Sequence, residues 1–193
     1  MKNIVIFGSG AGTNAENIIQ YFRNHKSIRI ALVVCNKPGA GILKVASQNK
    51  IPAVIVNKEE FYGTAQLITL LREQNISLIV LAGFLWLIPQ NILKAYPDKI
   101  LNIHPALLPE FGGKGMYGMK VHEQVHKAGK KETGITIHKV NENYDEGEFI
   151  FQSSCKIIPS DTPETIAAKV QQLEHEHYPA VIERYTLNYS PAP

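Results

Sequence analysis

An asparagine and a histidine stand two positions apart in the sequence Asn102-Ile103-His104-Pro105. Side chains alternate along a strand, so we expect Asn102 and His104 to share one face. Pro105 cannot continue a central ladder, which places the pair at the end of the strand. A neutral donor beside an imidazole can polarise a carbonyl group and move a proton. A histidine at a strand end is also common without any catalytic role.

A carboxylate that could assist this pair is Asp145, which lies in the polar segment 141–147. Aspartate is scarce, since the only others are Asp98 and Asp161. A carboxylate beside His104 would favour the protonated imidazole and raise its pKa. Turn chemistry also explains an aspartate shortly before Gly147 without any function.

A glycine-rich loop, Gly8-Ser9-Gly10-Ala11-Gly12, follows the first apolar run. A strand, a glycine turn and a helix N-terminus together form an anion site, because free N–H groups and the helix dipole meet there. No Gly-Lys-Ser/Thr follows, so the loop is not a P-loop. The dinucleotide fingerprint also fails, because Thr13 holds the third glycine position and Asn36-Lys37 replaces the expected acid. The loop therefore predicts a small phosphate ligand, or else a tight turn without a ligand.

The segment His122-Glu123-Gln124-Val125-His126 matches the zinc-hydrolase pattern HExxH. A zinc hydrolase is therefore a remote alternative, with His138, Glu142 or His175 as the third ligand. The predicted helix is short and places its apolar stripe next to the histidines, so we expect no metal. His177 near the C-terminus lies in phase with Ile166, Val170 and Leu173, which favours a partly buried helix end over a metal site.

The elements that must position these residues alternate between strands and helices in the first half of the chain. This alternation predicts a doubly wound, mostly parallel α/β sheet with a Rossmann-like N-terminal half. A Thr13–Glu16 capping box and an Asn57–Glu60 capping pair are expected to open the first and third helices, the third running through Leu71. The expected strands are 3–7, 28–35, 53–56, 78–82 and 100–103, with a helix at 42–49.

The second half predicts a β-hairpin and two helices. The hairpin is formed by strands 134–140 and 149–158, after a helix at 121–128. The last helix is expected to begin at Asp161 or Thr162, with Pro163 in its first turn. We expect residues 1–188 to form one domain and residues 189–193 to be a frayed tail.

The composition excludes several classes of protein. In 193 residues, 45% are hydrophobic and 19% are charged, as in ordinary globular domains. The net charge of +3 is too diffuse to indicate a nucleic-acid partner. The N-terminal apolar run is too short for a signal sequence or a membrane span. Two cysteines form no disulfide framework, so we expect a cytoplasmic setting. The oligomeric state is not determined, and a weak homodimer is one option.

Taken together, the motifs closely resemble the folate-dependent formyltransferase family over nearly the whole chain. The resemblance implies the formyltransferase fold and transfer of a formyl group from 10-formyltetrahydrofolate to the amine of phosphoribosylglycinamide, in purine (IMP) synthesis. Transfer to another amine, or hydrolysis of 10-formyltetrahydrofolate, is the alternative. The RNA-binding or regulatory domains of other family branches would need more residues than these 193, which favours the small acceptor. The motifs are Gly12-Thr13-Asn14, Leu81-Ala82-Gly83-Phe84, Asn102-Ile-His104-Pro105-x-Leu107-Leu108-Pro109, Thr133-Gly134-x-Thr136-x-His138 and Asp145-x-Gly147.

The resemblance also implies a role for each matching residue. Asn102 would hold the formyl oxygen, His104 would handle the proton, and Asp145 would support the charged histidine. The chain departs from the family at Trp86, where many relatives have arginine, at Glu148, where proline is usual, and in a longer loop at 110–117. The implied phosphate-binding residues are Gly12, Thr13 and Asn14; Glu174 would lie near the substrate amine; and the implied folate-binding residues are Leu85, Trp86, Leu87, Ile88, Asn102, Asn141, Tyr144 and Asp145.

Overall fold

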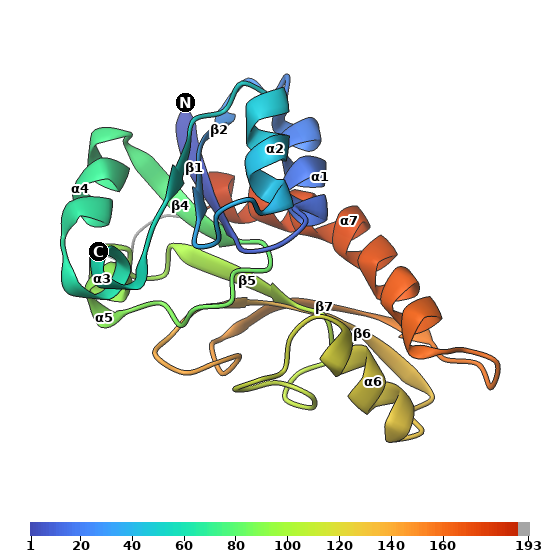
Figure 1. Cartoon of the computed structure of the whole chain (residues 1–193). Helices are drawn as coiled ribbons and strands as arrows, with labels where there is room; N and C mark the ends of the chain where they lie inside the picture. Colours follow the sequence, from blue (N-terminus) through green and yellow to red (C-terminus); the bar gives the residue numbers. More distant parts are fainter. Residues whose placement is uncertain (189–193) are drawn as a thin grey trace.

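Seven strands form one sheet in the order β3-β2-β1-β4-β5-β6-β7 (Figure 1). The structure, a computed structural model, describes residues 1–188, and the tail predicted at 189–193 lies outside them. Strands β1 to β5 pair in parallel, whereas β6 and β7 add an antiparallel hairpin at one edge. The predicted fold class is therefore confirmed. The strands are β1 (Lys2–Gly8), β2 (Ile28–Cys35), β3 (Ala53–Ile55), β4 (Ile76–Leu81), β5 (Ile100–His104), β6 (Glu132–Lys139) and β7 (Phe149–Lys156).

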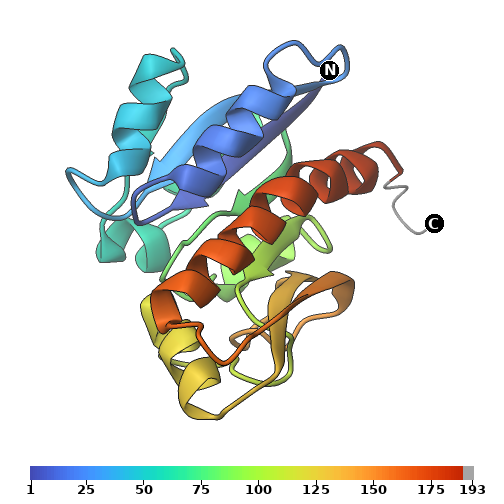
Figure 2. The ribbon, with the colours of Figure 1, turned by 90° about the vertical axis from the view of Figure 1, so that its right-hand side faces the viewer.

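Helices cover both faces of the sheet, with α1, α2 and α7 on one side and α3, α4 and α5 on the other (Figures 1 and 2). The central strand β1 is buried on both faces, which explains its uninterrupted apolar run. Within residues 1–188, no helix is both long and apolar enough to cross a membrane. The helices are α1 (Thr13–Phe22), α2 (Gly41–Gln48), α3 (Lys58–Gly63), α4 (Gln66–Glu73), α5 (Gln90–Ala95), α6 (Met119–Lys127) and α7 (Pro163–Asn188).

The start of α1 differs from the prediction. Gly12, not Thr13, is the N-cap, and no side chain caps the helix, so the predicted Thr13–Glu16 capping box is wrong. The Gly12 carbonyl accepts the Glu16 N–H at 2.8 Å. Gly12 has a φ of 89°, and a Cβ there would lie 2.8 Å from the Cα of Ile42. A left-handed turn packed against α2 requires glycine, and this turn leaves the first N–H groups of α1 uncovered.

The third predicted helix is two helices in the structure. The Asn57–Glu60 capping box is confirmed, but it opens only the short helix α3, which ends at Gly63. Thr64 is extended, with φ −126° and ψ 162°, and α4 begins two residues later. Glycine and threonine have low helix propensity, which explains why the chain breaks there.

The site is located by the order of the strands. From β1 the chain moves outward to β2 and β3, then returns to the other side of β1 with β4 and β5. The connections that leave β1 and β4 therefore run in opposite directions along the sheet, and a crevice opens between them. In open α/β sheets, ligands bind in this crevice, beyond the carboxyl ends of the strands. Asn102 and His104 lie near the carboxyl end of β5, as predicted.

Tyr178 of α7 ties this helix to two of these strands. Its fully buried hydroxyl lies 3.0 Å from the carbonyl oxygen of Leu81 and 3.2 Å from that of Leu101. We expect Tyr178→Phe to lower the free energy of unfolding by about 1–2 kcal/mol, because it removes a buried donor. Urea unfolding measures the change, and Tyr117→Phe at an exposed tyrosine is the control, expected within about 0.5 kcal/mol of wild type. Equal stability of both variants would contradict the prediction.

Candidate active site

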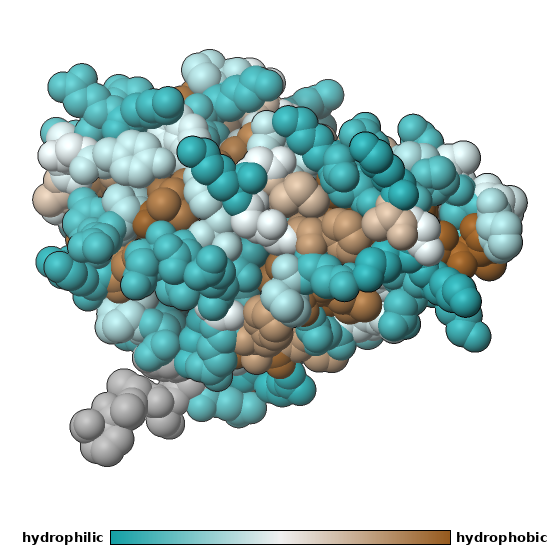
Figure 3. Space-filling view, turned by 90° about the horizontal axis from the view of Figure 1, so that it is seen from below, coloured by the Kyte–Doolittle hydropathy of each residue, from teal (hydrophilic) through white to brown (hydrophobic). Residues whose placement is uncertain are grey.

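A cavity of about 1040 Å³ lies at the carboxyl ends of β1, β4 and β5. Apolar side chains line one end, and Figure 3 shows hydrophobic residues gathered across the middle of the face seen from below. All of the predicted site residues line this cavity except Gly12 and Asn141. Those that do are Thr13, Asn14, Leu85, Trp86, Leu87, Ile88, Asn102, His104, Tyr144, Asp145 and Glu174.

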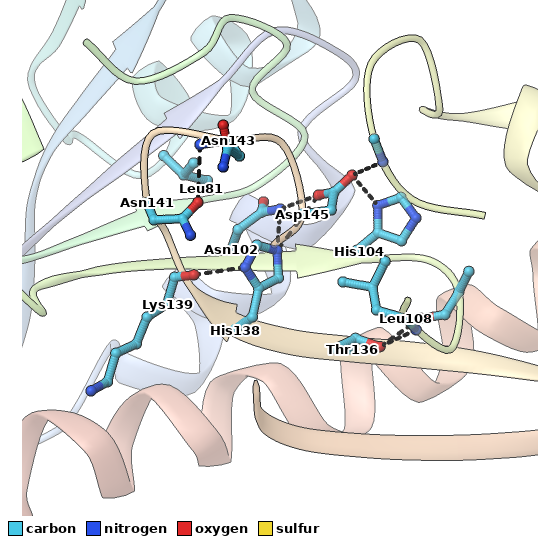
Figure 4. A network of polar contacts seen from close by, with 12 residues as sticks. Leu81, Asn102, His104, Leu108, Thr136, His138, Lys139, Asn141, Asn143 and Asp145 are labelled. Atoms are coloured by element: carbon cyan, nitrogen blue, oxygen red, sulfur yellow. Dashed lines mark hydrogen bonds and ion pairs between the residues drawn. The ribbon is translucent and has the colours of Figure 1, made fainter. Parts of the chain in front are cut away.

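Three of these residues meet at the centre of the cavity (Figure 4). Nδ1 of His104 lies 3.3 Å from Oδ2 of Asp145. The side-chain amide of Asn102 donates to Oδ1 of the same carboxylate at 3.5 Å. The structure therefore brings together the asparagine and histidine of β5 with the aspartate from the loop between β6 and β7.

Local backbone geometry holds Asp145 in place. The N–H of Gly113 donates to its Oδ2 at 3.0 Å, and Asp145 itself has a left-handed φ of 58°. A Cβ at Gly147 would lie 1.8 Å from the carbonyl oxygen of Lys139. Glycine is required there so that the loop can pass close to β6. The spacing Asp145-x-Gly147 thus combines a functional carboxylate with a close backbone approach.

His138 belongs to the same cluster, although the sequence identified it only as part of a motif and as a possible metal ligand. It lies opposite Asn102 in the antiparallel pair β5–β6. Its Nδ1 lies 2.7 Å from the Lys139 carbonyl and must donate to it. Its Nε2 is then free to accept the Asn102 amide at 3.1 Å. His138 therefore orients Asn102. The spacing of Thr136 and His138 is the same as that of Asn102 and His104, which was a signal in the sequence. Only the register of β6 against β5 shows that the two pairs lie opposite each other.

His104 is 3% exposed, and both of its ring nitrogens face oxygen acceptors. Its Nε2 donates to the carbonyl oxygen of Phe111 at 2.8 Å, which leaves Nδ1 toward Asp145. Burial lowers the pKa of His104 more than Asp145 and the Phe111 carbonyl raise it. The net direction is therefore downward. Asp145 raises the pKa of His104, as the sequence predicted, but the larger opposing effect of burial was not foreseen.

Asp145 is ionised in this environment. Burial raises its pKa, but the nearby His138 and His104 side chains and the hydrogen bond from the Gly113 N–H outweigh burial and hold the pKa below the ordinary value. At neutral pH the pair is thus a carboxylate beside a neutral imidazole. The geometry fits an imidazolium, whose two N–H groups would both find acceptors. Such a pair can take up a proton and release it again.

The polar end of the cavity is formed by the start of α1 and by α7. The Asn14 amide donates to Oε2 of Glu174 at 2.9 Å, while Oδ1 of Asn14 is buried without a partner in residues 1–188. Gln171 donates to the Thr13 hydroxyl at 3.2 Å. Burial raises the pKa of Glu174 to about 7, so this carboxyl is partly neutral at neutral pH. The arrangement can accommodate an anion at the N-terminus of α1.

The apolar end is built around Trp86. Its ring packs against those of Phe61 and Tyr62, with centroids 5.4 and 6.0 Å apart, and it also lines the cavity. Trp86 therefore packs among core aromatic rings and also forms part of the cavity wall. Asn141 lies away from the cavity surface, and its Oδ1 accepts the Asn143 N–H at 3.0 Å. Its role is to shape the turn that carries Tyr144 and Asp145.

The two histidines of the HExxH segment point to different places. His122 is buried and lines the cavity that contains Asn102 and His104, whereas His126 is exposed beside a second cavity. No group of three or more His, Cys, Asp or Glu side chains within residues 1–188 is placed to hold a metal ion. His177 is half-buried and packs against Phe151, with ring centroids 4.9 Å apart.

A family model described as "Formyl transferase" matches residues 2–182. The chain is 40% identical over 187 residues to the chloroplastic phosphoribosylglycinamide formyltransferase of Arabidopsis thaliana, covering 94% of this chain and 64% of that protein. The match to the corresponding protein of Vigna unguiculata is 38% identical over 189 residues and covers 94% of this chain and 60% of that protein. The chain thus spans less than two thirds of the length of these two plant relatives.

A bacterial relative matches along nearly its whole length. Phosphoribosylglycinamide formyltransferase of Bacillus subtilis is 38% identical over 189 residues, covering 95% of this chain and 94% of that one. Among solved structures, the phosphoribosylglycinamide formyltransferase of Bacillus halodurans superposes with a TM-score of 0.86 at 36% identity, covering 97% of this chain and 96% of that chain.

Proposed function

Because this chain belongs to the formyl transferase family, we propose that it transfers the formyl group of 10-formyltetrahydrofolate to the amine of phosphoribosylglycinamide, a step of purine synthesis. The observation that carries the proposal is the cluster of Asn102, His104 and Asp145 in the centre of the cavity. One end of that cavity is apolar and the other is suited to an anion, as the two substrates require.

The cluster supplies what formyl transfer needs. The substrate amine is itself the nucleophile, so no serine or cysteine nucleophile is required. As the new N–C bond forms, the Asn102 amide donates to the developing oxyanion. The weaker of its two contacts, at 3.5 Å to Asp145, is the one that substrate would replace. Asn102 is thus the electrostatic partner of the reacting carbonyl.

His104 and Asp145 handle the proton. The neutral imidazole accepts it from the attacking amine, directly or through a water that Asp145 orders. The resulting imidazolium is stabilised by the Asp145 carboxylate and the Phe111 carbonyl. His104 then returns the proton to the departing folate nitrogen as its bond to the formyl carbon breaks. The proton count balances, and the pair ends in its starting state.

The two ends of the cavity fit the two ligands. At the start of α1, uncovered N–H groups beside Thr13 and Asn14 would hold the phosphate, with the left-handed turn at Gly12 keeping them accessible. Glu174 would lie on the side of the amine substrate. The aromatic benzoyl ring of formylfolate would pack on the wall formed by Leu85–Ile88 and Tyr144.

We further propose that residues 1–188 act as one formyltransferase domain, supported by the single continuous sheet. The proposed partners are these two small molecules, without nucleic acid, membrane or metal, and a weak homodimer is compatible with the site. Cys35 and Cys155 are both free thiols, which supports the proposed cytoplasmic setting, although two relatives are chloroplastic.

The test is an absorbance assay of 10-formyltetrahydrofolate consumption, with and without phosphoribosylglycinamide. We expect consumption only when phosphoribosylglycinamide is present, and the same rate after treatment with a chelator. Equal consumption of 10-formyltetrahydrofolate without phosphoribosylglycinamide would establish hydrolysis instead. Consumption that requires a different amine would show that this amine, and not phosphoribosylglycinamide, is the formyl acceptor. Loss of activity on chelation, restored by zinc, would favour the HExxH alternative.

A further inference from the structure

His122 lines the same cavity as His104, but the proposed mechanism gives it no role. It comes from α6, and its side chain is 6% exposed. Its Nδ1 is completely buried and has no hydrogen-bond partner in residues 1–188. A buried ring nitrogen without a partner is uncommon and unfavourable, so such a group calls for an explanation.

The other buried polar side chains at the centre of the cavity are already satisfied. Asn102 bonds to His138 and Asp145, and His104 bonds to the Phe111 carbonyl. His122 differs because no side chain or backbone group of residues 1–188 completes its hydrogen bonding. Burial, together with the nearby charge of His104, lowers its pKa. It is therefore a neutral imidazole that offers one donor and one acceptor.

The position of α6 indicates which ligand His122 meets. Helix α6 packs against α7 (Figure 2). The part of α7 that lines the cavity includes Gln171 and Glu174, which contact Thr13 and Asn14 at the phosphate end. The folate wall, by contrast, follows β4 and the β6–β7 loop. His122 therefore lies on the side of the cavity proposed for the amine substrate.

We propose that His122 is a binding residue for the sugar of the amine substrate, forming a hydrogen bond with a ribose hydroxyl. A hydroxyl both donates and accepts, so it can complete a neutral imidazole whichever nitrogen carries the proton. This inference rests on the proposed function. It also gives the buried histidine of the HExxH segment a role in formyl transfer instead of metal binding.

The experiment measures KM for each substrate separately. His122→Ala is expected to raise KM for phosphoribosylglycinamide by about 3- to 10-fold, the effect of one hydrogen bond, with KM for 10-formyltetrahydrofolate unchanged. Of the two amide replacements, His122→Gln places its polar group near the position of Nε2 and His122→Asn near that of Nδ1. We expect only one of them to restore the wild-type KM, which a purely structural role would not produce.

His126→Ala is the matched control, because His126 lies one turn further along α6 and is exposed outside this cavity. It should leave both KM values unchanged. Should His122→Ala fail to fold, His122→Phe keeps a ring of similar shape without its nitrogens and is expected to raise the same KM. An unchanged KM for phosphoribosylglycinamide, or an equal rise in both KM values, would overturn the assignment of His122. Absence of turnover in the wild type would instead overturn the proposed function.

Discussion

His104→Ala is expected to reduce kcat by about 100- to 10,000-fold, the usual effect of removing a positioned proton-transfer group. His104 is the imidazole whose two nitrogens face Asp145 and the Phe111 carbonyl inside the cavity. Without it, the attacking amine loses the imidazole that is proposed to accept its proton. The reduction should appear in kcat more than in either KM, because the contact matters most in the transition state.

The measurement is the rate of 10-formyltetrahydrofolate consumption at saturating phosphoribosylglycinamide. Circular dichroism and urea unfolding must show that the variant keeps its fold, and His104→Asn provides a second variant with a polar group at this position. His177→Ala, a histidine outside this cavity, is the control and should retain wild-type kcat. A kcat of His104→Ala within tenfold of wild type would contradict the proposed role and favour a protein that binds its ligands without catalysis.

Asp145→Asn should reduce kcat by about 100-fold or more, because the amide cannot stabilise the imidazolium that forms during proton transfer. The pH dependence gives a second readout. Burial keeps the pKa of His104 below the ordinary value of a histidine, and in the proposed mechanism the neutral imidazole is the active form. In the wild type, kcat/KM should therefore fall as the pH decreases through this lowered pKa.

In Asp145→Asn the charge that raises the pKa of His104 is removed. The pKa must then fall further, and the acidic limb of the residual activity should move to lower pH. Glu142→Gln removes an exposed carboxylate from the same loop and should leave both the rate and the profile unchanged. An acidic limb that stays in place or moves to higher pH in Asp145→Asn would show that Asp145 does not act through His104.

Local sequence signals predicted most of the helices and strands, because the formation of a helix or strand depends largely on residues that are neighbours in the sequence. The uninterrupted apolar run of β1 indicated a strand covered on both faces, and the capping box at Asn57 is present. Alternation along β5 placed Asn102 and His104 on one face, and both line the cavity. The capping prediction that failed was overridden by a contact between distant residues. The Thr13–Glu16 pattern resembled a capping box, but packing of Gly12 against Ile42 decided where α1 begins.

The sequence by itself indicated the type of chemistry and its approximate location: an amide, an imidazole and a carboxylate near the carboxyl end of a parallel strand, with a candidate anion site after β1. Only the tertiary structure decided how these groups are tuned. The register of β6 against β5 brought His138 to Asn102, and the loop after β5 brought the Phe111 carbonyl to His104. The downward shift in the pKa of His104 arises from burial of the side chain by the whole fold. The spacing of residues along the sequence does not reveal that burial.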